Sequence, residues 1–476
     1  WQTQEDSKDD EAMMFTIAHT GLTLPDRSYY TDLTPANQKL QATAQSTMQE
    51  AFEGVGMSGE EAAAQAALAF KVETALAHAM VTKKRYRNIH AIHISRAKIK
   101  ENCPSFDWDT YFAGIGLAGL GEEDGVPPRL AVHDYKYLPQ VEALVWVLPM
   151  EELKAYLRWR VIYVHTSYLS ERFRAASLRL NDALYGMTAL PPRYRKCYYL
   201  AQRAFKEAAA KLFVDEYFTA DTQGTAMEML GKVRVAFEDH LASLSWMDNA
   251  TRAAAVEKLE AMHFEVGYPL DWPEMAEYAP LELLANASDA FFQNMQRVSL
   301  QHSERARERV FEAPNRDKWS HAATTVNAYY SRAKNALFIP AGILQEPFFS
   351  PEYPPARNFG GIGAILGHEI THGFDDNGRK YDAGGQRTNW WDAETDKDFD
   401  RKAACIARQF SNYTVSGAAV DGNLTLGENI ADSGGLRMAY RAMLSEQPQA
   451  TRVEQQAFFV SYAQLWCTVQ RPKAAQ

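Results

Sequence analysis

The sequence predicts a mostly α-helical protein in which a large helical domain, residues 1–300, precedes an α+β domain, residues 301–476. Three observations predict this fold class. A chain of 476 residues is long enough for two or three domains with substantial cores. Its first three hundred residues are mainly helical in pattern. Strand signals cluster between about residues 263 and 340, so the sheet is expected near the start of the second domain.

The helices of the first part follow one another with short breaks. Ser58 and Glu61 form a predicted capping box before an alanine-rich amphipathic run that reaches about Met80. One or two long helices are expected between residues 150 and 184. Further helices are predicted over residues 195–218, 224–244 and 251–262.

Two strands are predicted over residues 324–330 and 336–340, joined by a five-residue turn. An edge strand can add an extended peptide through backbone hydrogen bonds, and the Asn327 amide can both donate and accept. The segment therefore indicates a peptide-binding edge if a catalytic site lies beside it, and an ordinary hairpin if none does.

Composition and charge fit a large soluble protein and favour no nucleic-acid or membrane partner. Hydrophobic residues make up 46% of the chain and charged residues 23%, as in ordinary globular proteins. The net charge of −10 favours neither nucleic acid nor an anionic membrane as a partner. No apolar run approaches the roughly 20 residues of a membrane span, and no membrane anchor or signal peptide is visible.

The sequence His-Glu-x-x-His at residues 368–372 is the strongest chemical signal in the chain. On a helix, His368 and His372 lie on one face about one turn apart and can direct two imidazoles at one metal ion. Glu369 lies beside them, where it can reach a water on that ion. Glycines and aliphatic residues surround the motif, so a buried helix is expected, and buried histidines need partners. The motif therefore predicts a zinc site able to hydrolyse amides.

A catalytic zinc takes three protein ligands and keeps one position open, so a third ligand must lie elsewhere. A metzincin would have a histidine at residue 378, which is a glycine here. Glu428 and Asp432 lie four apart on a helix expected from Leu426 to Ser445, with Thr425 as its N-cap. Glu428 is the candidate ligand and Asp432 a partner for a histidine ring. An exposed acidic helix start, favoured by the helix dipole, is the alternative.

Asp376, one turn beyond His372, is expected to orient that ring in the same way.

Several segments resemble the neprilysin family of zinc endopeptidases, which includes neprilysin, endothelin-converting enzyme and bacterial oligopeptidase O. The segments are GLTLPDRSYY (21–30), VNAYY (326–330), FIPAGILQEPFF (338–349), GHEITHGFDD (367–376), LGENIADSGG (426–435) and AQLWC (463–467). The resemblance covers nearly the whole chain. It implies a thermolysin-like (gluzincin) catalytic domain and a helical domain that together enclose a cavity for peptide substrates.

The resemblance also implies roles for individual residues. The metal ligands for one Zn²⁺ ion are His368, His372 and Glu428; the catalytic residues are Glu369 and Asp432; the substrate backbone is held by Asn327 and Ala328. Candidates for an apolar side-chain pocket, each of which could instead be plain core, are Ile343, Phe348, Phe349 and Trp466.

The expected function is zinc-dependent endopeptidase activity on oligopeptides, with cleavage on the amino side of hydrophobic residues. Glu369 is the expected general base for a zinc-activated water and then the donor to the leaving nitrogen. In the family, a histidine and an arginine beyond the AQLWC-like segment stabilise the oxyanion, and no histidine follows His372 here. A catalytically incomplete, zinc-containing peptide-binding scaffold is therefore the alternative. An aminopeptidase of another gluzincin family is disfavoured, because no Gly-x-Met-Glu-Asn segment occurs.

Compared with the family, the chain is expected to lack segments at both ends, with which it could make covalent or non-covalent contacts. Four cysteines occur, at positions 103, 197, 405 and 467. They could form two internal disulfides or remain as free thiols in a reducing compartment. Three of them, Cys197, Cys405 and Cys467, match cysteines that bond to the terminal segments in animal ectoenzymes of the family. We therefore expect a secreted protein or a membrane-anchored ectodomain, periplasmic in a bacterium.

Overall fold

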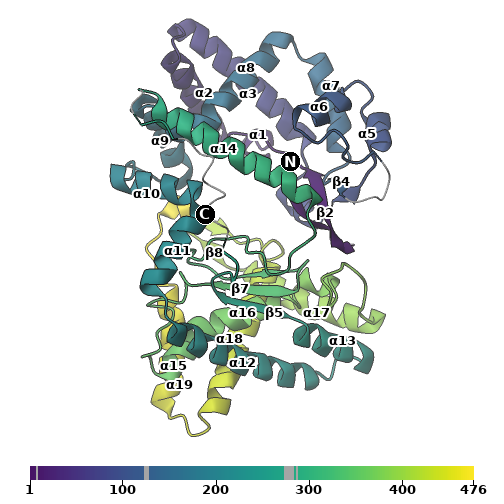
Figure 1. Cartoon of the computed structure of the whole chain (residues 1–476), viewed down its shortest axis with the longest axis vertical. Helices are drawn as coiled ribbons and strands as arrows, with labels where there is room; N and C mark the ends of the chain where they lie inside the picture. Colours follow the sequence, from purple (N-terminus) through teal and green to yellow (C-terminus); the bar gives the residue numbers. More distant parts are fainter. Residues whose placement is uncertain (7–8, 90, 123–127, 273–282, 286–287, 476) are drawn as a thin grey trace.

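The computed structural model describes residues 1–6, 9–89, 91–122, 128–272, 283–285 and 288–475. These residues are mostly helical, as the sequence predicts, and their strands form three small sheets. Figure 1 shows an upper part built from the first helices and a lower part that holds the later ones. The long helix α14 (Ala290–Glu308) crosses the front of the upper part, although it follows the first helices of the lower part in sequence.

The upper part packs helices on one another around a buried aromatic core. Its helices are α1 (Ser28–Thr31), α2 (Pro35–Gly54), α3 (Gly59–Ala79), α4 (Lys83–Asn88), α5 (Arg96–Asn102), α6 (Trp108–Gly114), α7 (Tyr137–Val147), α8 (Met150–His165) and α9 (Glu171–Tyr185). The capping box of Ser58 and Glu61 at the start of α3 is confirmed, with both reciprocal hydrogen bonds. Phe52 and Trp159 are fully buried where α2, α3 and α8 meet.

A four-stranded sheet in the upper part was not predicted. Its strands are β1 (Gln2–Asp6), β2 (Asp9–Ile17), β3 (Ile92–His93) and β4 (Arg129–Val132), in the order β1-β2-β4-β3. Strand β2 pairs in parallel with β4, from Met14 opposite Arg129 to Ile17 opposite Val132. Strands β1 and β2 are neighbours in sequence, but β3 and β4 are short and β4 joins the sheet beside β2 from more than one hundred residues away, so local periodicity did not reveal this sheet.

The lower part contains the helix with the His-Glu-x-x-His sequence. Its elements are α10 (Arg193–Ala204), α11 (Lys206–Tyr217), α12 (Ala220–Ala242), α13 (Asn249–Glu260), α15 (Pro355–Asn358), the π-helical turn η4 (Phe359–Gly363), α16 (Ala364–His372), α17 (Ala393–Phe410), α18 (Leu426–Glu446) and α19 (Arg452–Leu465). The short helix α20 (Pro472–Ala475) returns to α9 of the upper part, where Lys473 donates to the Asp182 carbonyl oxygen. One core joins residues 210–266 to residues 323–458. The cores therefore follow the predicted ranges 1–300 and 301–476 only in part.

A three-stranded sheet lies beside α16. Strand β5 (His263–Gly267) pairs in parallel with the central strand β7 (Ala336–Pro340), and β6 (Tyr329–Ser331) pairs antiparallel on the other side of β7. The strand predicted over residues 336–340 is confirmed. The strand predicted over residues 324–330 is shorter than expected, because Asn327 and Ala328 precede the first residue that pairs with β7. The edge strand β6 therefore begins just after the residues expected to hold a peptide. A third, two-stranded sheet pairs β8 (Thr414–Val415) with β9 (Ala418–Ala419).

The cysteines give no support to internal disulfides. All four are described, and each has a free thiol: Cys103 is buried, while Cys197, Cys405 and Cys467 are exposed.

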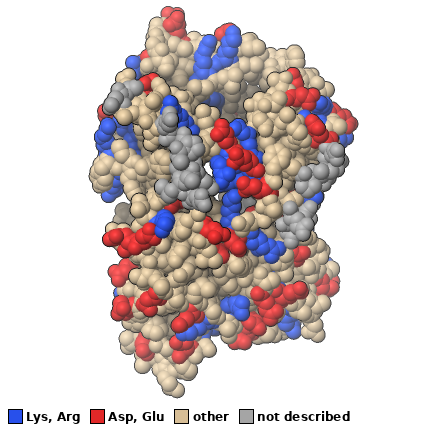
Figure 2. Space-filling model, in the orientation of Figure 1, with Lys and Arg blue, Asp and Glu red and all other residues tan. Residues whose placement is uncertain are grey.

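Among the described helices, none combines the length and the apolar character needed to cross a membrane. Figure 2 shows acidic and basic side chains interspersed over one face of the molecule.

Candidate active site

Helix α16 presents two histidines from a buried position. Leu366 and Ile370 are fully buried and fix one face of the helix in the core. His368 and His372 are four residues apart, so their rings lie on the same face, with ring centroids 4.6 Å apart. The helix therefore aims both imidazoles at one point, as its sequence spacing predicts.

Helices α16 and α18 touch backbone to backbone. A Cβ atom added to Gly435 would lie 2.3 Å from the His368 nitrogen, and one added to Gly367 would lie 2.8 Å from the Gly435 Cα. Only glycine allows so close an approach at this point. Glu428 and Asp432 stand two turns and one turn before Gly435 on α18, so the crossing brings both carboxylates to the histidine rings.

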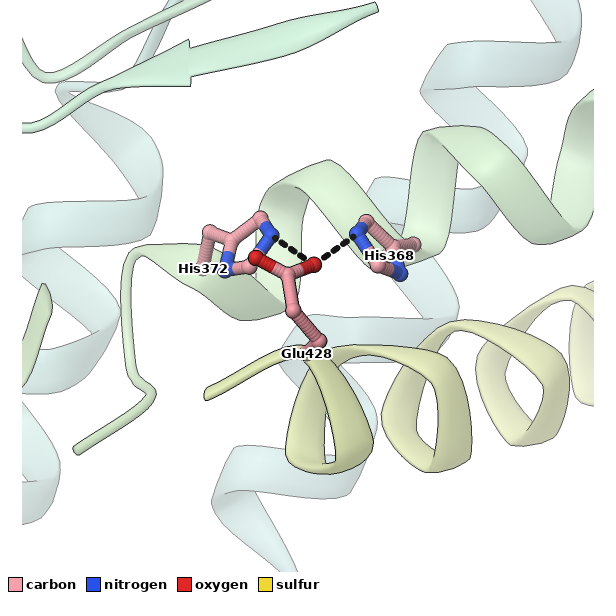
Figure 3. Close-up of side chains that lie close together, drawn as sticks. All are labelled: His368, His372 and Glu428. Carbon is pink, nitrogen blue, oxygen red and sulfur yellow. Dashed lines mark ion pairs between the residues drawn. The ribbon is translucent and has the colours of Figure 1, made fainter. Parts of the chain in front are cut away.

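Three ligand atoms converge between the two helices (Figure 3). Glu428 Oε2 lies 3.4 Å from His368 Nε2 and 3.5 Å from His372 Nε2. Ligands bound at ~2.0–2.2 Å around a tetrahedral zinc lie roughly 3.3–3.6 Å from one another. The three residues therefore fit a zinc ion without rearrangement of the two helices.

The other nitrogen of each ring is held by a carboxylate. His368 Nδ1 lies 2.9 Å from Asp432 Oδ1, and His372 Nδ1 lies 2.7 Å from Asp375 Oδ2. A proton on each Nδ1 leaves both Nε2 lone pairs directed at the metal position. Asp375 is itself fixed, because its Oδ1 accepts hydrogen bonds from the backbone amides of residues 377 and 378.

The expectation that Asp376 orients His372 is not what the structure shows, because Asp375 does so. The expectation assumed that the helix continued, so that the fourth residue after His372 would return to its face. Helix α16 ends at His372, and the chain turns there, so that the third residue reaches the ring instead.

Thr425 is the N-cap residue of α18, as predicted, but its side chain does not cap the helix. The Thr425 hydroxyl instead accepts a hydrogen bond from Asn429 Nδ2.

Glu428 and each of the two histidines shift one another's pKa values. Burial alone lowers the pKa of His368, but its hydrogen bonds to Asp432 and Glu428 outweigh this and raise the pKa to about 9. Burial likewise lowers the pKa of His372, and Asp375 and Glu428 raise it to about 10. The two histidines hold the pKa of Glu428 far below its usual range. In the metal-free protein at neutral pH, both histidines therefore carry a positive charge, and a zinc dication would replace the proton on each Nε2.

Glu369 lies next to the ligands and lines the cavity beside His368. Its side chain is buried, with 6% of the residue exposed, and burial raises its pKa despite the two histidines. Burial disfavours the charged form of the Glu369 carboxylate and so makes it a stronger proton acceptor, as a general base requires. Glu369 is not one of the three converging residues, so its carboxylate is not needed as a ligand and remains available for proton transfer.

An apolar cavity of about 150 Å³ opens beside His368 and Glu369. Four of the residues expected to bind substrate line it, and Asp432 does so as well: Asn327, Ile343, Phe348 and Trp466. Val326 and Tyr462 also line this cavity and were missed. Tyr462 lies on α19 four residues before Trp466, which directly follows the last residue of that helix, so helical spacing could have identified it. Ala328 and Phe349 are buried and do not line the cavity.

A second cluster, His263, Glu265 and Asp317, differs from the first in its spacing. His263 Nε2 lies 2.8 Å from Glu265 Oε1 and 3.2 Å from Asp317 Oδ1, which are hydrogen-bonding distances. The His263 imidazole therefore contacts both carboxylates directly at these distances, and the cluster lacks the wider spacing of the first site.

A His-Glu-x-x-His helix joined by a glutamate from a later helix is the arrangement of a zinc metallopeptidase. The chain belongs to peptidase family M13. The model of the N-terminal part of that family matches residues 1–269, and that of the peptidase part matches residues 327–476. The predicted resemblance to the neprilysin family is thereby confirmed.

Relatives and solved structures agree with this assignment. The chain is 34% identical to human endothelin-converting enzyme 1 over 99% of its own length and 62% of that protein. It is 32% identical to an endothelin-converting enzyme homolog from Locusta migratoria, covering 67% of it. The chain thus spans less than two thirds of the length of the human enzyme.

The fold matches the crystal structure of the Mycobacterium tuberculosis zinc metalloprotease Zmp1 in complex with an inhibitor, with a TM-score of 0.91 and 28% identity. That match covers 100% of this chain and 72% of the other. The crystal structure of PepO from Lactobacillus rhamnosis matches with a TM-score of 0.88 and 26% identity, over 99% of this chain and 73% of that one.

Proposed function

We propose that the protein is a zinc-dependent endopeptidase that hydrolyses oligopeptides on the amino side of hydrophobic residues. The observation that carries this proposal is the buried Glu369 next to three ligand atoms spaced for zinc. A purely structural zinc site has no use for a buried general base, and its coordination is closed by four protein ligands. Three ligands and a neighbouring base therefore favour hydrolysis.

The residues of the site divide into three tasks. His368, His372 and Glu428 hold one Zn²⁺ ion, which when bound acts as a Lewis acid and lowers the pKa of water towards neutrality. Glu369 accepts the proton of the attacking water and delivers it to the leaving nitrogen of the peptide. Asp432 keeps the ring of His368 in the tautomer that binds metal.

The substrate would lie along the edge of the three-stranded sheet. Asn327 and Ala328 directly precede the edge strand β6, where an extended peptide can add backbone hydrogen bonds, and Asn327 also lines the apolar cavity. A cavity of ~150 Å³ holds a molecule as large as benzene, so this one accepts one Leu- or Phe-sized side chain. Its place beside Glu369 supports a preference for an apolar residue at the scissile bond.

The proposed function also includes a compartment for the protein and a restriction on the size of its substrates. We place the protein outside the cytosol, as a secreted protein, a membrane-anchored ectodomain or a periplasmic enzyme. The upper part of the molecule would close over the site and restrict it to oligopeptides. Thiol titration of the complete protein tests the location, because four free thiols would contradict an oxidising compartment.

The decisive test uses zinc-loaded protein and an internally quenched peptide with Leu or Phe after the scissile bond. We expect cleavage that a chelator abolishes. Glu369→Gln should lower kcat by about 10²–10⁴-fold while zinc stays bound at one equivalent. Stoichiometric zinc without chelator-sensitive cleavage would instead support the peptide-binding scaffold. Cleavage that is lost when the peptide is N-acetylated would indicate an aminopeptidase.

A further inference from the structure

Lys258, on α13, is a fully buried lysine whose ammonium group faces the loop behind the metal site. Its Nζ donates to the carbonyl oxygens of Gly373 at 2.7 Å, Gly378 at 2.8 Å and Tyr381 at 2.6 Å. The rings of Phe374 and Trp390 lie 5.5 Å and 5.8 Å from the same nitrogen. The side chain is 0% exposed, so these groups replace its hydration completely.

Three acceptors require three protons on one nitrogen. An ammonium group has three N–H donors and a neutral amine has only two, so the charged form alone satisfies every carbonyl. Burial lowers the pKa of Lys258 to about 7, and the neighbouring Asp375 and Asp382 carboxylates oppose this change. A buried charge costs free energy unless it is fully hydrogen-bonded, and this one is.

The three carbonyls belong to the segment that carries Asp375. Gly373 follows His372 directly, and Gly378 packs so closely that an added Cβ atom would lie 1.8 Å from the His372 carbonyl oxygen. Asp375 sits between these two glycines, with Oδ2 on His372 Nδ1 and Oδ1 on the Gly378 amide. Lys258 therefore holds the backbone on both sides of the residue that orients His372.

The backbone carbonyl of Lys258 is held by a second buried side chain, that of Asn335. Asn335 donates from Nδ2 to the Lys258 carbonyl and to the Ala383 carbonyl, both at 3.0 Å, and its Oδ1 accepts from Tyr330 at 2.8 Å. Asn335 ends the turn between β6 and β7 at a φ of 45°, where asparagine is better tolerated than most residues. Asn335 therefore connects Tyr330 of the edge strand β6 to the backbone of Lys258.

We propose that Lys258 is a positioning residue for the metal site, which acts on zinc through the segment 373–381 and the hydrogen bond from His372 to Asp375. The inference rests on the proposed metal site and adds to it a residue outside every metal-binding motif. It predicts that Lys258 and Asp375 act on zinc affinity through the same path. A residue that only stabilised the fold would change the free energy of unfolding and leave zinc affinity alone.

The test measures zinc affinity by competition with a chromophoric chelator, together with the visible spectrum of the cobalt-substituted protein. The variants are Lys258→Met, which keeps the length and removes the donors, Asp375→Asn, and the double variant. Glu73→Gln is the matched control. Glu73 is also fully buried and hydrogen-bonded, to Thr23 and Tyr30, but it lies on α3 in the upper part.

We expect Asp375→Asn to weaken zinc binding by about 10–100-fold, as loss of a partner to a metal ligand typically does. Lys258→Met should weaken it by roughly tenfold and alter the cobalt spectrum, and the double variant should bind no more weakly than Asp375→Asn alone. Glu73→Gln should bind zinc as the unmodified protein does. Effects that multiply in the double variant, or unchanged zinc binding by Lys258→Met, would overturn the proposal.

Two further outcomes are decisive. Circular dichroism shows whether Lys258→Met folds, and Lys258→Gln, which keeps two donors, is the milder substitution. If neither variant folds, Lys258 serves the fold as a whole and the proposal is overturned. If the unmodified protein binds no stoichiometric zinc, the proposed function fails, which is distinct from a loss of coupling between Lys258 and Asp375.

Discussion

The contact between Gly435 and the His368 backbone offers a sharp test of how the site is assembled. Gly435→Ala adds one methyl group that would lie 2.3 Å from the His368 nitrogen and 2.6 Å from the Ala364 oxygen. An ordinary contact is at least 3.4 Å, so the two helices must separate locally by about 1 Å. Neither neighbour can yield by rotating a side chain, because both atoms belong to the backbone of α16.

The separation changes both stability and metal binding. Overpacking of this kind costs about 1–3 kcal/mol of unfolding free energy. Glu428 and Asp432 lie on the same helix as Gly435. The separation therefore lengthens the distance from Glu428 Oε2 to His368 Nε2, now 3.4 Å, and that from Asp432 Oδ1 to His368 Nδ1, now 2.9 Å. Zinc ligand distances tolerate only ~0.2 Å, so we expect zinc affinity to fall by at least about tenfold.

Gly231→Ala on α12 is the matched control, because it makes the same substitution inside a helix at a position with no atom within 4 Å. It should leave zinc affinity unchanged and stabilise the protein by about 0.5–1 kcal/mol, as alanine does in a helix interior. Chelator competition gives the affinities, and thermal unfolding with and without zinc gives the stabilities. Wild-type zinc affinity in folded Gly435→Ala would refute the view that this crossing places Glu428.

Two other outcomes follow from the site. Zinc binding at pH 7 should release close to two protons, because the metal-free histidines His368 and His372 have pKa values of about 9 and 10, and the affinity should therefore rise with pH up to about 10. Calorimetry in buffers of different ionisation enthalpy measures this number, and a release near zero would contradict the assigned partners. Asn327→Ala should raise KM for the quenched peptide by roughly tenfold with little change in zinc affinity, since Asn327 lines the cavity but is not among the converging ligand atoms. An effect on kcat alone would exclude it from substrate binding.

The features predictable from the sequence were those encoded by local spacing. Two histidines four apart, and a glutamate and aspartate four apart on a second helix, place their side chains on common faces whatever the rest of the chain does. The capping box at Ser58 and the strand over residues 336–340 were predictable for the same reason.

Features that depend on tertiary structure were not predictable. The end of α16 at His372 decided between Asp375 and Asp376, and a sequence pattern does not fix a helix end to one residue. In the upper sheet, the pairing of β2 with β4 joins residues more than one hundred positions apart. Lys258 looks like any surface lysine in sequence, and only the fold shows that three carbonyl oxygens surround it.

The most direct test of the central claim is X-ray absorption spectroscopy at the zinc edge of the loaded protein, compared with its Glu428→Ala variant. The structure predicts two imidazole nitrogens at ~2.0–2.1 Å and carboxylate and water oxygens at ~2.0–2.2 Å, with one oxygen ligand changed in the variant. Sulfur at ~2.3 Å, or a spectrum that Glu428→Ala leaves unchanged, would show that the zinc is held elsewhere.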